Sequence, residues 1–511
     1  MILEEGVKIF KLANKFRKLK TSENNLGKKR AAQYLCQLMG SEKGIFLKIG
    51  QALGSSANSM DEFKKLTDGK LEALTMEVIK NIIEETYHLP MEEIFSSFNP
   101  SGRMASIGQV HEAMLLDGTP VAVKIQYPHI KKAIQNQLNF LNLIPLKMGP
   151  VRKWGIPVND YLELLWRNMD EELSYLHEIR NQKRYKKMVQ EHFTVSVADV
   201  LDKYSCDHIF FQSWQEGTKI EDVCKNWSME NKQKAGHILL ESFFIHFFHH
   251  GFLQSDPNDG NYLFRMDGNG RPHVVYLDFG SCTEYSDDFR LAALRLILAA
   301  NNKEEIDPLP YLALLGFDET KLKHIHKSLP ALVKILFEPL LSDRPYDLKN
   351  WGAQKQIDII LGEFKWWFRS AGSPHFFMLM KSFAGLVSQL TRLEANLEWK
   401  KILFKTVSPL VAKASSFQAP PVSLEKYTFK SLATKLRINV HRDGKEKADI
   451  TLPIHALVDL EGFIDEDVLQ KIRARKIDLS KIILNNTRSG CYPAELFNLD
   501  EGYSKFKVWT E

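Results

Sequence analysis

The sequence predicts a mixed α+β protein, preceded by a helical extension and followed by a small α+β appendage. A chain of 511 residues is too long for one ordinary domain, so we expect two or three units. With 44% hydrophobic and 26% charged residues, the composition is typical of a folded protein rather than a disordered one. Strand-like alternation is confined to short stretches between long segments with helical spacing, which favours a mixed architecture.

Residues 1–98 are interpreted as the helical extension, because apolar residues recur there at helical spacing with hardly any β-branched alternation. Residues 99–414 are predicted to form the main mixed α+β part of the chain. Short strands are expected on either side of an Asp117-Gly118 turn. Further along the chain we expect a helix at about 160–190, a strand at 209–211, a helix at 234–250, two short strands at 261–264 and 274–277, and helices from 286 to about 410.

Residues 415–423 (SSFQAPPVS) are predicted to be a linker, because paired prolines stop a helix and favour an extended chain. Residues 424–511 then form the appendage. Alternating apolar residues flank an Asp443-Gly444 turn, as in a hairpin, and alternation returns at Phe506 and Val508.

The charge and the cysteine content limit the expected kind of partner and the expected cellular compartment. The net charge of +5 is small for this length, and no nucleic-acid partner is predicted. The five cysteines are scattered and none has CxxC spacing, which favours a reducing compartment without a disulfide framework. Neither a signal peptide nor a membrane-spanning stretch is recognised, so we expect a cytoplasmic protein, with peripheral membrane attachment as an open alternative.

The strongest chemical signal is the loop Asp256-Pro-Asn-Asp-Gly-Asn261, followed by Asp278-Phe-Gly280. Asp256 is suited to orient or deprotonate a phosphoryl acceptor, and Asn261 to offer a neutral oxygen to Mg²⁺. Asp278 comes at the end of a strand-like stretch and adds a carboxylate for the metal. Each motif alone occurs by chance, but both together and in this order indicate an ATP and Mg²⁺ site.

A lysine and a glutamate upstream complete this pattern. Lys124 ends the run Val121-Ala-Val-Lys124, which matches the kinase pattern in which a lysine holds the α- and β-phosphates. Gly108 and Val110 fit the end of the glycine-rich kinase template. Glu178 lies on a predicted helix between the strand and the catalytic loop, where a kinase keeps the partner of its lysine.

Taken together, these motifs resemble the UbiB (ADCK) family of atypical kinase/ATPases over roughly residues 30–410. That family carries, in order, KxGQ, ASIGQVH, VAVK, ExDYxxE, DPxxGN and DFG. The corresponding segments here are Lys48-Ile-Gly50-Gln51, Ala105–His111, Val121–Lys124, Glu172–Glu178, Asp256–Asn261 and Asp278–Gly280.

The resemblance implies a two-lobed protein-kinase-like fold over residues 99–414, with an N-lobe over about 99–214 and a C-lobe over about 215–414, in which the helical extension covers the cleft. Lys48 and Gln51 would line the active site from above, with Lys48 paired to Glu172. Lys124 would pair with Glu178. The nucleotide would also be bound by the loop residues Ala105, Ser106, Gly108 and Val110, with Asp256 at the reaction centre and Asn261 and Asp278 on Mg²⁺. Family members resemble ATPases that support quinone or other isoprenoid-lipid metabolism, which implies a lipid or quinone-pathway client.

Three positions depart from the family pattern. Ser174 replaces the second acid of ExD, and Gln254 replaces a histidine before Asp-Pro. Arg103 and Met104 replace the first two alanines of the alanine-rich loop, which puts the nucleotide preference in question.

Several alternatives stay open at this point. Residues 4–20 form a basic amphipathic pattern that suits an anionic membrane surface, or equally docking on the protein's own core. The activity is interpreted as that of a kinase/ATPase, with a small-molecule or protein phosphotransferase and a nucleotide-sensing scaffold as alternatives.

Overall fold

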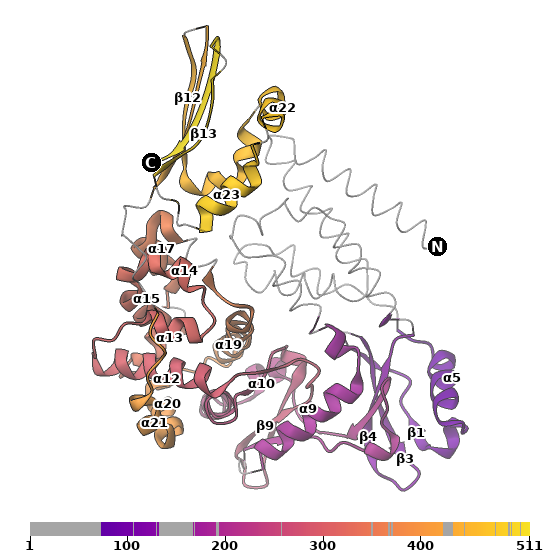
Figure 1. Cartoon of the computed structure of the whole chain (residues 1–511). Helices are drawn as coiled ribbons and strands as arrows, with labels where there is room; N and C mark the ends of the chain where they lie inside the picture. Colours follow the sequence, from indigo (N-terminus) through magenta and orange to yellow (C-terminus); the bar gives the residue numbers. More distant parts are fainter. Residues whose placement is uncertain are drawn as a thin grey trace.

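The structure, a computed structural model, describes residues 73–511 except 106, 129, 132–166, 168, 191–193, 257, 349–350, 366–367, 369–370, 423–432, 444, 465, 476, 489–490, 492 and 501. The predictions for Lys48, Gln51, Ser106 and the basic helix at 4–20 lie outside these residues. In the described part, an N-lobe sheet, a helical C-lobe and a C-terminal sheet follow one another along the chain (Figure 1).

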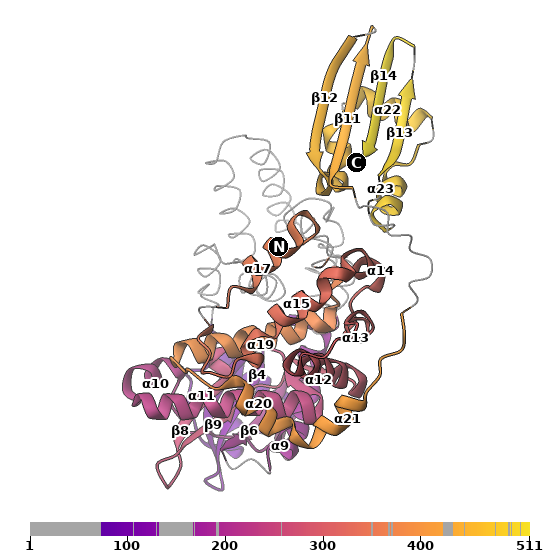
Figure 2. The same ribbon diagram turned by 90° about the vertical axis from the view of Figure 1, so that its left-hand side faces the viewer.

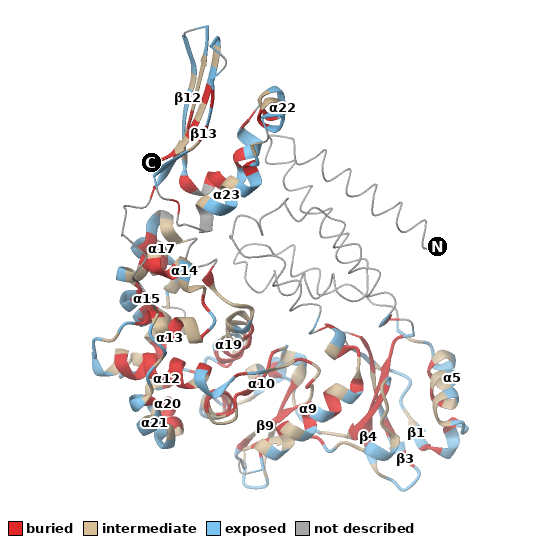
Figure 3. Cartoon of the chain, viewed as in Figure 1, coloured by how far each residue is buried: buried red, intermediate tan, exposed pale blue. Residues whose placement is uncertain are grey.

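The N-lobe is built on a five-stranded antiparallel sheet with the order β1-β3-β4-β6, in which β2 also pairs with β3. The strands are β1 (Phe95–Phe98), β2 (Arg103–Met104), β3 (Gly108–Leu115), β4 (Pro120–Gln126) and β6 (Ile209–Ser213). β3 and β4 form the predicted hairpin, and Gly118 supplies the positive φ of 81° that its turn requires. Both faces of β4 are covered, so its run of Val, Ala and Ile is almost wholly buried (Figure 3).

Helix α5 (Met76–Tyr87) packs on this sheet and shares its core. Thr75 caps the helix by accepting a hydrogen bond from the backbone N–H of Val78. Ile79 and Ile83 are fully buried, in one cluster with the apolar residues of β4. The helical interpretation of residues 1–98 is wrong at its end, because residues 95–98 form strand β1. Phe95 there stacks on Phe211 of β6, and this sheet contact outweighs local helix preference.

Helix α9 (Tyr175–Met188) lies between the N-lobe sheet and two smaller sheets (Figure 1). One has the order β5-β9-β8, from β5 (Val195–Val197), β9 (Pro272–Tyr276) and β8 (Tyr262–Met266). The other pairs β7 (Phe252–Gln254) with β10 (Cys282–Glu284). Because β7 precedes the Asp256 loop and β9 precedes Asp278, these sheets fix where both loops begin.

The C-lobe is formed by helices that pack around one apolar core. Serine side chains cap α11, α12 and α19, and Pro374 occupies the first turn of α19, as helix starts prefer. Trp399 of α20 is fully buried at the centre of this core. The helices are α10 (Ile220–Asn226), α11 (Met229–Phe244), the π-helical turn η3 (Ile245–His250), α12 (Asp287–Asn302), α13 (Leu309–Leu314), α14 (Glu319–Leu322), α15 (Leu329–Leu336), α16 (Glu338–Leu341), α17 (Ala353–Leu361), α19 (Pro374–Arg392), α20 (Trp399–Val407) and α21 (Val411–Ser416). Short 3₁₀ turns are η1 (Met91–Glu93), η2 (Asp202–Tyr204), η4 (Asp259–Asn261), η5 (Lys323–Ser328), η7 (Gly362–Phe364) and η8 (Ser408–Leu410).

The C-terminal sheet has the order β12-β11-β14-β13 and is antiparallel throughout. Its strands are β11 (Lys435–Arg442), β12 (Lys445–Pro453), β13 (Ala494–Asp500) and β14 (Ser504–Thr510). The predicted hairpin is therefore confirmed as β11 and β12. One face of the sheet is covered by η9 (Ile454–Phe463), α22 (Glu466–Ala474) and α23 (Leu479–Arg488) (Figure 2). Both views place this unit at the end of the C-lobe away from the N-lobe sheet (Figures 1 and 2).

None of the helices in the described ranges is both long and apolar enough to cross a bilayer.

Candidate active site

The site centres on a buried lysine between two carboxylates. Lys124, near the end of β4, is 5% exposed. Its Nζ contacts Glu178 Oε1 in the first turn of α9 and lies 3.1 Å from Asp278 Oδ2, just after β9. Three segments that are far apart in the sequence therefore meet at one ammonium group.

Burial and charge act in opposite directions on this group. Burial by itself would lower the pKa of the Lys124 ammonium, but Asp278 and Glu178 outweigh it and raise that pKa above its usual range. Burial also raises the pKa of the Glu178 carboxyl, and the nearby Lys124 ammonium opposes that change. The lysine therefore stays positively charged, and a charged ammonium is suited to binding phosphate.

Helix α9 also holds the Asp-Phe-Gly segment in place. Asn181 Nδ2 donates to the backbone carbonyl of Phe279 at 2.9 Å. The Phe279 ring is fully buried and lies 4.8 Å from the ring of Tyr185, centroid to centroid. Asp278 Oδ1 accepts from the backbone N–H of Gly280 at 3.0 Å. These contacts aim the Asp278 carboxylate at Lys124.

Asp256 and Asn261 lie at the two ends of one tight turn. Asn258 caps the turn by accepting from the backbone N–H of Gly260, and Asn261 Nδ2 donates to the Asp256 backbone carbonyl at 2.8 Å. With its NH₂ group so engaged, the carboxamide oxygen of Asn261 is the atom available to a cation. The Asp256 carboxylate is 36% exposed, within reach of a substrate.

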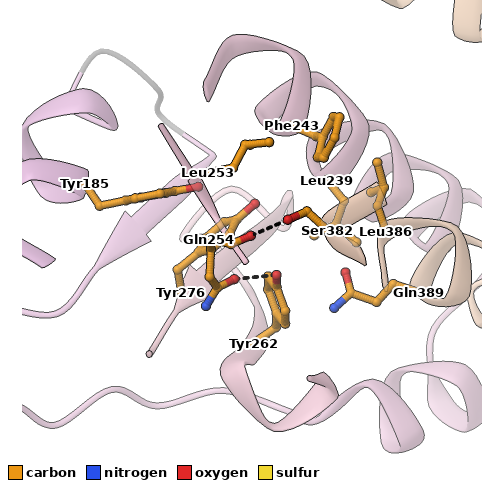
Figure 4. Close-up of a pocket in the computed structure, with 10 residues that line it drawn as sticks. All are labelled: Tyr185, Leu239, Phe243, Leu253, Gln254, Tyr262, Tyr276, Ser382, Leu386 and Gln389. Atoms are coloured by element: carbon orange, nitrogen blue, oxygen red, sulfur yellow. Dashed lines mark hydrogen bonds between the residues drawn. The ribbon is translucent and has the colours of Figure 1, made fainter. Parts of the chain in front are cut away.

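Gln254 joins the two loops. Its Nε2 donates to the Asp278 carbonyl, and its Oε1 accepts from the Tyr262 hydroxyl at 2.5 Å. Gln254 lines a small cavity of about 30 Å³ behind the loop, together with Tyr185, Leu239, Phe243, Leu253, Tyr262, Tyr276, Ser382, Leu386 and Gln389 (Figure 4). The glutamine at this departure from the family pattern is thus a structural link between the loops.

The alanine-rich loop is the turn between β2 and β3. The backbone N–H of Ala105 donates to the Gly108 carbonyl at 2.8 Å, and Val110 follows on β3, half-buried. Gly108 is packed too closely for any side chain. A Cβ there would lie 2.2 Å from the Ile125 carbonyl oxygen and 2.8 Å from the Tyr175 hydroxyl. The glycine therefore has a packing requirement that exists without any nucleotide.

Glu172 and Ser174, the first and last residues of the segment that corresponds to ExD, lie in different surroundings. Glu172 is 9% exposed and borders the site: a Cβ on Gly280 would lie 3.8 Å from its Cγ. Ser174, which replaces the second acid, donates to Asp207 Oδ1 at 2.6 Å. A carboxylate from the β5–β6 connection thus lies next to the position where the acid is missing.

Helix α19 contributes contacts that the sequence did not reveal. Lys381 Nζ lies 3.5 Å from Asp256 Oδ1, Ser382 Oγ donates to the Gln254 carbonyl at 3.1 Å, and Arg392 contacts Asp259. No motif marks these residues, which follow the loop by more than a hundred positions. An apolar helix with one lysine in its middle was the available signal.

The donor set fits Mg²⁺. Asn261 and Asp278 offer a carbonyl and a carboxylate oxygen, the ligands that this hard cation prefers. Among the described residues, no group of three or more His, Cys, Asp or Glu side chains could hold a metal ion. Mg²⁺ commonly completes its shell with water and substrate phosphates, so a set of two protein ligands suits a metal that arrives with a nucleotide.

The two lobes, the Lys124–Glu178 pair and the Asp278 loop define a protein-kinase-like domain. Residues 66–307 match the model of the ABC1 atypical kinase-like domain. This part of the chain is an ABC1/AarF atypical kinase-like domain, and the resemblance to the UbiB family is confirmed.

Several curated relatives bear related names. The chain is 24% identical over 344 residues to "Atypical kinase coq-8, mitochondrial" of Caenorhabditis elegans, covering 65% of this chain and 44% of that protein. It is 28% identical over 285 residues to "AarF domain-containing protein kinase 1" of Gallus gallus, covering 53% of each. This chain thus spans about half the length of these two relatives. With "Atypical kinase COQ8B, mitochondrial" of Rattus norvegicus it shares 25% identity over 406 residues, 77% of this chain and 75% of that one.

Among solved structures, the complex of Rv3197 with erythromycin from Mycobacterium tuberculosis overlaps with a TM-score of 0.48 at 22% identity, covering 75% of this chain and 96% of that chain. A likeness at this level carries no argument about activity.

Proposed function

We propose that this protein is an atypical kinase/ATPase that binds ATP with Mg²⁺ and supports quinone or other isoprenoid-lipid metabolism. The observation that carries the proposal is the buried ammonium of Lys124 held between Glu178 and Asp278. A charged lysine is costly to bury, and a kinase-like domain uses this arrangement to hold nucleotide phosphates.

In this proposal, each side chain of the site has a separate role in phosphoryl transfer. Lys124 binds the α- and β-phosphates, and Glu178 keeps its ammonium in place. Asn261 and Asp278 would hold Mg²⁺, which would supply positive charge to offset that of the phosphates. The alanine-rich loop, with Ala105, Ser106, Gly108 and Val110, covers the nucleotide.

Asp256 acts on the acceptor. It orients the acceptor hydroxyl, or a water molecule in the ATPase reaction, and takes its proton. The acceptor oxygen forms a bond to the γ-phosphorus while the bond to the β–γ bridging oxygen breaks, and ADP leaves with that electron pair. Within this proposal, Lys48 and Gln51 cover the cleft, Lys48 pairs with Glu172, and a bulky peptide acceptor is excluded.

The lipid context comes from the family and from the predicted basic helix at residues 4–20. Two other functions use the same site: transfer of the phosphoryl group to a small molecule or protein, and nucleotide sensing with little turnover. The presence of Lys124, Glu178 and Asp278 in one contact network favours turnover over sensing.

The experiment measures ATP hydrolysis and transfer of labelled phosphate by the full chain. It is run with and without anionic liposomes and a phenolic quinone-precursor mimic. Asp278→Asn should abolish the thermal stabilisation by MgATP, because it removes the metal's carboxylate. Asp288→Asn is the matched control, since Asp288 is exposed in the first turn of α12.

The outcomes separate the candidates. Phosphate release stimulated by lipid supports the proposal, whereas label in a small molecule or protein supports a phosphotransferase. Stabilisation by MgATP without either supports a sensor. Equal stabilisation of wild type and Asp278→Asn by MgATP would show that the metal assignment is wrong.

A further inference from the structure

The catalytic loop has a charge imbalance that another element corrects. Residues 256–261 contain two carboxylates, Asp256 and Asp259, and no cation. Helix α19 supplies one cation to each: Lys381 lies 3.5 Å from Asp256, and Arg392 contacts Asp259. The one-to-one match indicates that this helix is fitted to the loop.

The spacing on the helix explains how both cations reach the loop. Lys381 and Arg392 are eleven residues apart, about three helical turns, so they lie on one face roughly 16 Å apart. Between them, Ser382 bonds to the Gln254 carbonyl, and Leu386 and Gln389 line the cavity behind the loop (Figure 4). One face of α19 therefore supports the whole loop.

The two ion pairs differ in their surroundings. Arg392 also binds Glu221 at 3.0 Å, so it bridges two elements of the C-lobe surface. Lys381 forms one ion pair among the described residues, with Asp256, and its side chain is 26% exposed. A lysine ammonium has three N–H donors, so Lys381 can hold Asp256 and still face the phosphoryl acceptor side.

We propose that Lys381 is a positioning residue for Asp256. Its ammonium fixes one carboxylate oxygen, so that the other faces the acceptor. It also offsets the repulsion between the Asp256 carboxylate and incoming phosphates. The inference rests on the proposed function, in which Asp256 takes the acceptor's proton.

The test compares Lys381→Met, Lys381→Arg and wild type in ATP turnover, with Mg·ADP binding measured in parallel. Because misplaced catalytic groups cost on the order of 10- to 100-fold, Lys381→Met should lower kcat by about that factor. KM for ATP and the Kd for Mg·ADP should stay within about twofold, since Lys381 does not contact the Lys124 site. Lys381→Arg keeps the charge and should recover most of kcat.

Lys400→Met is the matched control. The Lys400 side chain is also 26% exposed and also binds an aspartate, Asp343, at 2.6 Å, but it lies on α20. The Lys400→Met variant should have about the same melting temperature as Lys381→Met, and its kcat should equal that of the wild type.

Three results would overturn the inference. One is a Lys381→Met kcat within twofold of wild type, and a second is parallel loss of kcat in Lys381→Met and Lys400→Met. The third is failure of Lys381→Arg to recover kcat. Absence of turnover in wild type would instead reject the proposed function, and the inference with it.

Discussion

Glu178→Gln tests the charge balance at Lys124. The substitution keeps the shape of the side chain and an oxygen for the lysine, and removes one negative charge. Lys124 is then left with Asp278 as its counter-charge, at 3.1 Å. The bond from the backbone N–H of Phe279 to Glu178, at 3.4 Å, is weakened at the same time.

The magnitude follows from the burial of the pair. Removing one partner of a buried ion pair costs about 3–5 kcal/mol. Here Asp278 remains and glutamine still accepts a hydrogen bond, so we expect roughly half, about 2 kcal/mol. Since about 1.4 kcal/mol is a factor of ten, amides of β4 and α9 should exchange hydrogen roughly 30-fold faster. With Glu178 neutral, the Asp278 carboxylate should interact more strongly with Lys124 and be less available to Mg²⁺. The thermal stabilisation by MgATP should therefore decrease.

Hydrogen exchange followed by mass spectrometry measures the local change directly. Glu112→Gln is the control, because Glu112 is exposed on the neighbouring strand β3 and makes no side-chain ion pair within the described ranges. If Glu178→Gln and Glu112→Gln exchange alike in β4 and α9, the pair does not stabilise the N-lobe and the reasoning fails.

Three further predictions follow from the fold and sequence. Gly108→Ala should destabilise the N-lobe by about 1–3 kcal/mol, measured by urea unfolding, because its Cβ overlaps the Ile125 carbonyl; wild-type stability would contradict the close packing. Burial lowers the pKa of His324 to about 4, although Asp318 opposes the change. Between about pH 6.5 and 4 the unfolded state therefore binds a proton that the native state does not, and stability falls as the pH falls. At pH 5 the loss is about 1 kcal/mol after allowance for partial exposure, and His324→Gln should remove it from the urea-unfolding curves. A chain that starts at Ser22 should float poorly with anionic liposomes yet bind ATP, and Phe16→Asp should weaken flotation of the full chain; equal flotation of all three would place the membrane surface elsewhere.

Local pattern was sufficient to predict the centre of the fold. Val121–Lys124 is a buried strand whose β-branched residues, Val121 and Val123, share one face of the sheet. Strands β11 and β12 form a hairpin because their apolar residues alternate on both sides of Asp443. Residues 95–98 were misread because Phe-Ser-Ser-Phe is too short to show a period. Its strand state depends on pairing with β3 and on the Phe95–Phe211 stack, which are long-range contacts.

The site residues that belong to a recognisable sequence motif could be predicted. Lys124 and Glu178 could be paired in advance because their chemistry requires a partner. The contact between Lys381 and Asp256 could not be predicted in the same way. Lys381 lies 125 positions after Asp256 in the sequence, and the contact depends on where helix α19 packs against the loop. Gly108 shows the opposite case: the motif suggested nucleotide contact, and the structure adds a steric requirement that no pattern displays.

The small ladder of β7 and β10 restricts how inhibitors can act on this site. Gln254 pairs with Cys282, the backbone N–H of Ser255 donates to the Ser281 carbonyl, and Ser255 Oγ donates to the Thr283 hydroxyl. The Asp256 loop and the Asp278 loop are therefore joined in one hydrogen-bonded piece. A compound that needs Phe279 to swing out must break this ladder and the bond from Asn181. Under the proposed function, screening should instead favour compounds that bind next to Lys124, where the nucleotide is proposed to bind, and leave that piece intact.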